Sequence, residues 1–227
     1  MKQSIGKKLL LRFLGGVCVF VMVCAALFSL GVLKFEDRQE VVKEPDDFGS
    51  LFTGMLVDGI MNGHGDIVYK NGDRYVGYFD NGEYSGEGIF TSVAGWNYSG
   101  EFQNGRAHGS GVFTASSGGV FKGNFEDGRI TGQGRFAAPE GWVFDGMWDQ
   151  GRQVGKGEFT FIDGSVYVGD FLDGAASGFG VYTDINGWKY EGGFLQGLFD
   201  GDGILTFAND EVLTGIWDFG QLITIVE

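Results

Sequence analysis

Apolar and polar positions alternate along most of the chain beyond residue 49. In GDRYVGYFDNGEYSGEGIF (72–90), most aromatic residues and glycines share one parity within each short run, and mostly polar residues stand between them. Such alternation is typical of strands that bury one face, because successive side chains point to opposite faces. Asn-Gly and Asp-Gly pairs between the runs are strong signals for tight hairpin turns. The pattern predicts short antiparallel strands with one apolar and one mostly solvated face.

The alternation repeats every 23 residues. Counted from Gly49 as position 1, glycine stands at positions 1, 6, 11, 15 and 17 of seven full units and at positions 6 and 11 of a partial eighth, without insertion or deletion. Aromatic residues dominate positions 4, 8 and 19 in the same register. Each unit reads as two strands, so residues 49–227 are expected to form an all-β meander of about sixteen strands.

The recurrent glycines have two expected roles. At positions 6, 15 and 17 the absence of a side chain would let neighbouring aromatic rings lie flat over bare backbone, because glycine in a strand often marks close approach. At position 11, glycine is expected to supply a positive φ in a turn.

The unit G-x-x-Y-x-G-x-F-x-x-G-x-x-x-G-x-G, with 72–94 as a close example, resembles the MORN repeat (membrane occupation and recognition nexus). The resemblance covers residues 49–227. It implies an elongated, twisted, single antiparallel sheet of stacked 23-residue hairpin repeats. It also implies a scaffold, a linker or a dimerising platform. Some proteins with this repeat are proposed to bind phospholipid.

One stretch before the repeats does not alternate. Residues 13–33 form 21 consecutive positions without a charge. As a helix they would span about 31 Å, close to the ~30 Å hydrocarbon thickness of a bilayer. We expect one transmembrane helix, with a cleaved signal peptide as the alternative. The expected organisation is a short basic tail (1–12), the anchor (13–33), a charged linker (34–48) and the repeat domain (49–227).

The charges around the apolar segment indicate its orientation. The tail carries Lys2, Lys7, Lys8 and Arg12 without an acid, whereas residues 34–48 mix three bases with six acids. Because positive charge favours the cytoplasmic side, we expect a cytoplasmic N-terminus and a repeat domain outside the membrane.

The repeat domain is strongly acidic. Residues 49–227 hold 24 acids and nine bases, and the whole chain has a net charge of −14. Such a surface lacks the bases that neutralise nucleic acid phosphates, and it would be repelled by anionic lipid. Membrane attachment is therefore assigned to residues 13–33, and a protein partner or self-association to the repeats.

Residues for catalysis or metal binding do not cluster in the sequence. His64 and His108 occupy different positions of their units, and the acids at Asp200 and Asp202 fail the calcium-loop pattern because Ile204 stands at its fifth place. We expect no enzyme activity, metal or cofactor.

Position 2 carries tryptophan in every second central unit, at Trp96, Trp142 and Trp188, and small residues between them. One interpretation is packing, in which each indole covers the small residue on the next hairpin. The other is a spaced ladder that binds an extended partner, such as a peptide, a glycan or a second copy of the chain. The candidate binding residues are the three tryptophans and the position 4 ring of each of their repeats: Trp96, Trp142, Trp188, Tyr98, Phe144 and Tyr190.

These features favour a membrane-tethered, non-enzymatic scaffold that presents its sheet outside the membrane. The first alternative is a surface module that binds a cell-envelope glycan through the tryptophans. An enzyme is the least favoured class.

Overall fold

The computed structural model describes residues 38–46 and 48–226. The predicted tail and membrane anchor lie outside these residues. The described part consists of β-strands and turns, and it contains no helix long and apolar enough to cross a bilayer. The all-β prediction is confirmed for this part.

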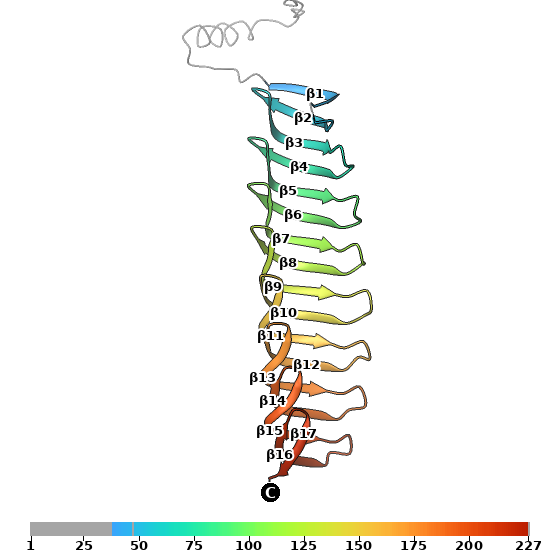
Figure 1. Ribbon diagram of the computed structural model, residues 1–227, viewed down its shortest axis with the longest axis vertical. Helices are drawn as coiled ribbons and strands as arrows, with labels where there is room; N and C mark the ends of the chain where they lie inside the picture. Colours follow the sequence, from blue (N-terminus) through green and yellow to red (C-terminus); the bar gives the residue numbers. More distant parts are fainter. Residues whose placement is uncertain (1–37, 47, 227) are drawn as a thin grey trace, which may run out of the picture. The chain divides into compact units, whose positions relative to one another are not determined.

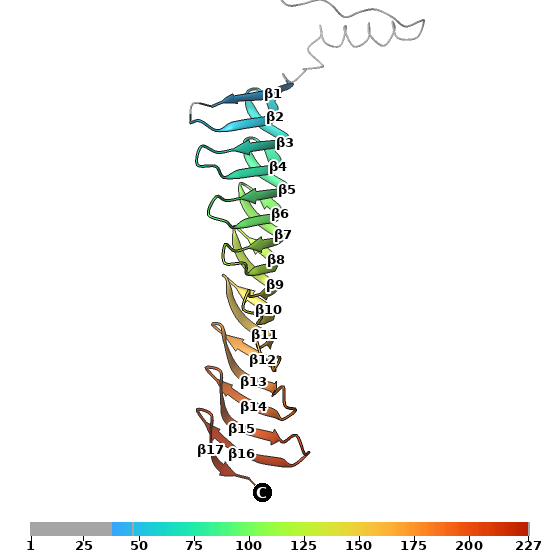
Figure 2. The same cartoon turned by 90° about the vertical axis from the view of Figure 1, so that its right-hand side faces the viewer.

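The repeats form one antiparallel sheet in which strand order follows chain order from β2 to β17 (Figures 1 and 2). The first strand of each repeat has seven residues: β2 (Leu51–Val57), β4 (Arg74–Asp80), β6 (Asn97–Gln103), β8 (Val120–Glu126), β10 (Val143–Asp149), β12 (Val166–Leu172), β14 (Lys189–Leu195) and β16 (Val212–Asp218). The second has nine: β3 (Ile60–Val68), β5 (Glu83–Thr91), β7 (Arg106–Thr114), β9 (Arg129–Ala137), β11 (Arg152–Thr160), β13 (Ala175–Thr183) and β15 (Leu198–Thr206). The last strand, β17 (Gln221–Ile225), is shorter.

A further strand, β1 (Arg38–Pro45), lies within the segment expected to be a linker. It pairs with β2, whose outer edge would otherwise present unpaired backbone groups. The sequence RQEVVKEP is charged and ends in proline, which cannot donate a backbone hydrogen bond, and both features are typical of strands at a sheet edge. Its charge made the segment resemble a linker.

Two kinds of turn connect the strands. Within a repeat, positions 10 and 11 both have positive φ, as at Asn81 (49°) and Gly82 (85°), which defines a two-residue type I′ turn. Between repeats, a three-residue loop is closed by hydrogen bonds from Gly72 N–H to the Tyr69 carbonyl and from Tyr69 N–H to the Asp73 carbonyl, both 2.8 Å. The predicted positive φ at position 11 is confirmed.

Glycines at positions 6 and 17 lie opposite each other and beneath an aromatic ring. Gly123 pairs with Gly134 across β8 and β9. A Cβ atom added to Gly123 would lie 2.6 Å from Phe121 Cζ and 2.6 Å from Gly134 Cα. The predicted close approach is therefore confirmed at these two positions.

The prediction for position 15 is wrong. Gly155 has a φ of 61°, and the space around an added Cβ contains no ring: its nearest neighbour is Met147 Cβ at 3.8 Å. Gly146 pairs with Gly157 but Met147 pairs with Val154, so the register shifts here in a β-bulge. Glycine serves at this position because the bulge needs a left-handed backbone.

The rings at positions 4 and 8 form a continuous column, called the spine below. The position 4 ring leans over the glycines and meets the position 8 ring of its own strand and that of the next repeat, as Phe121 does with Phe125 (5.4 Å, 88°) and Trp148 (5.3 Å, 84°). Such edge-to-face contacts stabilise aromatic pairs in addition to the free energy gained by burying their apolar surface. The spine comprises Phe52, Phe79, Tyr75, Phe102, Tyr98, Phe125, Phe121, Trp148, Phe144, Phe171, Tyr167, Phe194, Tyr190 and Trp217.

Candidate functional site

The three repeated tryptophans lie on the same face as the spine and pack against it. Each is half-buried. Trp96 and Trp142 lie between position 19 rings of neighbouring repeats, whereas Trp188 contacts Tyr182 at position 19 and Phe199 at position 13. Trp96 stacks on Phe90 (5.0 Å between centroids, 14° between planes) and lies tilted against Phe113 (5.9 Å, 39°). Trp142 stacks on Phe159 (5.3 Å, 16°). The row of tryptophans therefore packs within the sheet and still exposes part of each indole.

The 46-residue interval follows from how these rings share neighbours. Phe90 and Phe113 both contact Trp96, whereas Phe136 contacts Trp142 at 5.1 Å. Gly119, the small residue between the two tryptophans, is covered by Phe136, whose Cζ would lie 2.8 Å from an added Cβ. The packing hypothesis assigned that cover to an indole, which is wrong in this detail. Because the repeats between the tryptophans carry a small residue at position 2, no two indoles pack against the same position 19 ring.

The other three candidate residues are spine rings. Tyr98, Phe144 and Tyr190 are 4%, 0% and 0% exposed. A partner could not reach Phe144 or Tyr190 without displacing their neighbours. These three residues support the face on which the tryptophans lie, and a direct contact with a partner stays a prediction for them.

The spine tyrosines also anchor their own strands. The hydroxyl of Tyr98 donates to the Glu101 carbonyl (2.9 Å), and that of Tyr167 donates to the Asp170 carbonyl (2.9 Å). Burial raises the pKa of Tyr75, Tyr98, Tyr167 and Tyr190 to about 12 each, with nearby carboxylates adding to the effect at the last three.

We expect these tyrosines to make the sheet sensitive to alkali. Because their folded pKa lies above the ordinary value of about 10, their contribution to stability is complete below about pH 10 and is lost as the pH rises through about 12. Phenolate absorbance and far-ultraviolet circular dichroism, followed together, should change together in this range. Tyr167→Phe keeps the ring, as Phe144 does naturally, and should remove one group from the late titration. Titration of all tyrosines near pH 10 with an intact fold would contradict the expectation.

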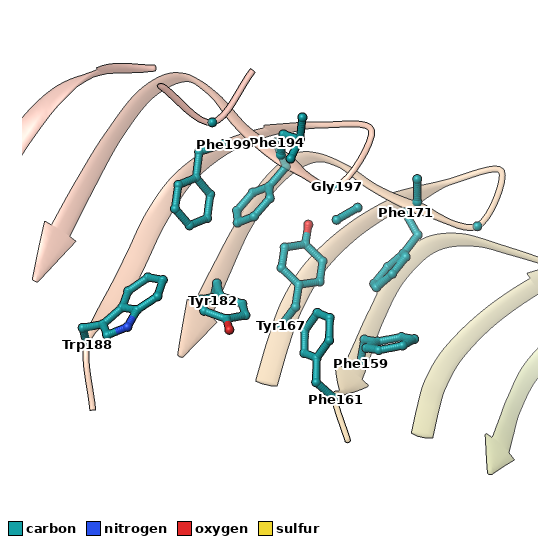
Figure 3. Close-up of a pocket in the computed structure, with 14 residues that line it drawn as sticks. Phe159, Phe161, Tyr167, Phe171, Tyr182, Trp188, Phe194, Gly197 and Phe199 are labelled. Atoms are coloured by element: carbon teal, nitrogen blue, oxygen red, sulfur yellow. The ribbon is translucent and has the colours of Figure 1, made fainter. Parts of the chain in front are cut away.

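A cavity of about 580 Å³ opens on the aromatic face near the last of the three tryptophans (Figure 3). Its lining includes the rings of Phe161, Tyr182 and Trp188 and the smaller side chains of Ala176 and Leu198. Trp188 is the only one of the six candidate binding residues that lines this cavity. We call it the Ala176 pocket.

The pocket exists where a ring is missing. Position 13 carries an aromatic residue in two repeats, and each stacks on the position 4 ring of its own repeat. Tyr84 lies 3.7 Å from Tyr75 at 15°, and Phe199 lies 3.8 Å from Tyr190 at 12°. Ala176 is the corresponding residue beside Tyr167. Its methyl group leaves room that a ring fills in the next repeat.

Comparison with protein families identifies the repeat. The model of the MORN repeat matches seven consecutive segments: residues 52–74, 75–96, 98–120, 121–143, 144–166, 167–189 and 190–212. The chain belongs to the MORN repeat family. Its sheet of stacked hairpins is thus assembled from MORN repeats, and the resemblance of the sequence to this family is confirmed.

Sequence comparison with curated proteins finds no match to this MORN-repeat chain. Among solved structures, the TCP domain of Drosophila melanogaster SAS-4 (dCPAP), in complex with a proline-rich motif of Ana2 (dSTIL), is similar with a TM-score of 0.45 and 13% identity, over 94% of this chain and 100% of that one. The TCP10 domain of Danio rerio CPAP, in complex with a STIL peptide, has a TM-score of 0.41 and 12% identity, over 84% and 99%. These scores lie below 0.5, so they carry no conclusion about the function of this chain.

Charges are unevenly distributed among the MORN repeats. At the hairpin tips, Arg129 donates to Gln150 (3.3 Å) and Arg152 donates to Asp173 (3.1 Å), so each arginine links its repeat to the next. The series ends at Ala175, where an alanine replaces the arginine and borders the Ala176 pocket. The small pair Ala175-Ala176 marks this pocket only once the packing of the other repeats is known.

The histidines of the MORN repeats lie apart. His64 packs edge-on against Tyr78 (5.3 Å, 82°), whereas His108 contributes its backbone carbonyl to the hydroxyl of Tyr98 (3.4 Å). Within residues 38–46 and 48–226, no group of three His, Cys, Asp or Glu side chains is arranged to hold a metal ion. The Ala176 pocket is the candidate binding site on the described part of the molecule.

Proposed function

We propose that this MORN-repeat protein is a membrane-tethered, non-enzymatic scaffold that holds a protein partner against the aromatic face of its sheet. The Ala176 pocket is the observation that carries the proposal. Its lining is apolar and open to solvent, and Leu198 at its edge is 46% exposed. Pockets of this size with aromatic walls are typical binding sites, and half-exposed tryptophan is a common anchor at interfaces.

A glycan partner is the alternative, because aromatic faces also suit sugar rings. The lining offers few hydrogen-bonding side chains, Tyr182 and Trp188 among them, whereas a sugar buried there would need partners for many hydroxyl groups. The apolar character of the site therefore favours a protein segment.

We expect a photo-crosslinking amino acid at Leu198 to capture a discrete protein in cells. Ile204 provides the matched control, because it lies in the same repeat at 42% exposure and does not line the Ala176 pocket. Adducts should form at Leu198, weaken on Trp188→Ala, and be few at Ile204. Equal adducts at both positions would contradict the assignment of the binding site to the Ala176 pocket, and polysaccharide in place of protein would favour the glycan alternative.

The location outside the membrane rests on the apolar segment 13–33 and on the basic tail before it. The only cysteines, Cys18 and Cys24, stand in that segment. Lys122→Cys would therefore place a single thiol on the exposed surface of the sheet.

We expect a membrane-impermeant maleimide to label Lys122→Cys in intact cells, because the repeat domain faces outward in this proposal. The parent chain, with its two native cysteines, gives the background. Labelling that requires permeabilised cells would place the domain in the cytoplasm and refute this part of the proposal.

A further inference from the structure

The Ala176 pocket includes the space that an aromatic ring fills in the next repeat. In the following repeat, Phe199 occupies the corresponding position and lies flat on Tyr190. Beside Ala176, the equivalent volume is bounded by the rings of Phe161, Tyr182 and Trp188 (Figure 3). Because these walls offer mostly carbon atoms, a buried polar group would lose its hydrogen bonds to water without replacement. The occupant must therefore bring a bulky apolar or aromatic group.

The charge around the pocket constrains what flanks that group. Residues 159–220, which contain all lining residues, hold ten acids and one base. The single base, Lys189, is 3.1 Å from the carboxylate of Glu191. Six of the nine bases of the repeat domain lie earlier, between residues 106 and 156. The pocket thus lies in the most acidic part of the sheet.

A cationic occupant gains from this arrangement in two ways. Complementary charge steers association and weakens with salt. A guanidinium or ammonium group is also attracted to the face of an exposed aromatic ring, and Trp188 and Tyr182 offer such rings at the pocket. A second copy of this acidic chain would be repelled, and an uncharged glycan would gain nothing from the acids.

We propose that the Ala176 pocket receives one aromatic or branched aliphatic side chain from a basic peptide segment of a partner protein, with Lys or Arg on either side of that residue. This rests on the proposed function, and it adds the chemistry of the partner and the residue of the sheet that makes room for it.

Ala176→Phe tests the pocket without removing any contact. The new ring is expected to occupy the part of the cavity beside Tyr167, as Phe199 lies beside Tyr190 in the next repeat. The fold should therefore persist with an equal or higher melting temperature. Ala107→Phe is the matched control, because Ala107 holds the same position beside Tyr98. Its own repeat contains Arg106, and the next repeat contains Arg129, so its surroundings are less acidic. The two variants add the same atoms to the same sheet.

The experiment selects twelve-residue peptides from a random display library on the full-length chain in nonionic detergent, with empty micelles as counter-selection. Recovered peptides are synthesised, and their affinities are measured by fluorescence anisotropy. We expect one bulky apolar residue between basic residues. Alanine at that residue, or glutamate at the bases, should weaken binding by at least about tenfold. Ala176→Phe should cause a similar loss, whereas Ala107→Phe should change affinity less than about twofold.

The outcomes separate this inference from the proposed function. Peptides that are neutral or acidic, or that bind Ala176→Phe as well as the wild type, overturn the inference, and so does a selection that enriches no peptide. If Leu198 still captures a protein in cells in these cases, the scaffold function stands with a different partner chemistry. If the selected basic peptides behave as expected but Leu198 captures only polysaccharide, the pocket chemistry stands and the assigned function fails.

Discussion

Gly123→Val should destabilise the repeat domain by about 3 kcal/mol or more, whereas Lys122→Val should change its stability by less than about 0.5 kcal/mol. The two residues are neighbours on β8 and receive the same new side chain. A Cβ at Gly123 lies 2.6 Å from a backbone atom, Gly134 Cα, and 2.6 Å from the ring of Phe121. Neither can move aside, because Phe121 is itself fully buried among Phe125 and Trp148.

Lys122 points to the other face, where its side chain is exposed. Valine also has a high strand propensity, so this control separates steric overlap from any general effect of the substitution. Thermal unfolding followed by circular dichroism measures both variants. Equal shifts in melting temperature would show that the rings do not depend on bare glycine beneath them.

The alternation of residues was sufficient to predict the faces of the sheet. Positions 4, 6 and 8 lie in one strand, and the extra residues of the bulge stand on the partner strand β9, between Thr131 and Gly134. Parity therefore placed Phe121, Gly123 and Phe125 together correctly. The turn at Asn81-Gly82 was predictable for the same reason, since two adjacent residues determine it. These features depend on local sequence alone.

Position 15 was not predictable in this way. Parity groups Gly155 with Gly157, but the pairing of Met147 with Val154 leaves Gly155 in a bulge. A bulge is a property of the register between two strands, and single-strand alternation contains no information on register. The same limit applies to β1, whose pairing depends on the open edge of β2 and not on its own pattern.

The Ala176 pocket could not be predicted from the sequence for a related reason. An alanine in a strand is unremarkable until the structure shows that Tyr84 and Phe199, at the same position, stack on the spine. The tryptophans were recognisable because they recur, but the rings against which they pack, such as Phe90 and Phe159, were identified only in the structure. A site made by a missing side chain needs the packing of the other repeats as its reference.

Phe144→Ala should cost about 3–5 kcal/mol, the range for loss of a buried phenylalanine, and at least twice the cost of Trp142→Ala. Phe144 is fully buried and meets Trp148 at 5.2 Å and Phe171 at 4.8 Å, so its loss interrupts the spine between two repeats. Trp142 is half-buried at the side of the spine, and solvent already reaches part of its ring.

The two substitutions should also differ in where the sheet loosens. Stability in repeat proteins is close to a sum of terms between neighbours, so Phe144→Ala should raise hydrogen exchange in β9 to β12 more than at either end of the sheet. Trp142→Ala should lower the melting temperature modestly and leave protein capture at Leu198 intact, because Trp142 does not line the Ala176 pocket. Loss of capture on Trp142→Ala at an unchanged melting temperature would instead make the whole tryptophan row a binding ladder, with the pocket as only one part of it.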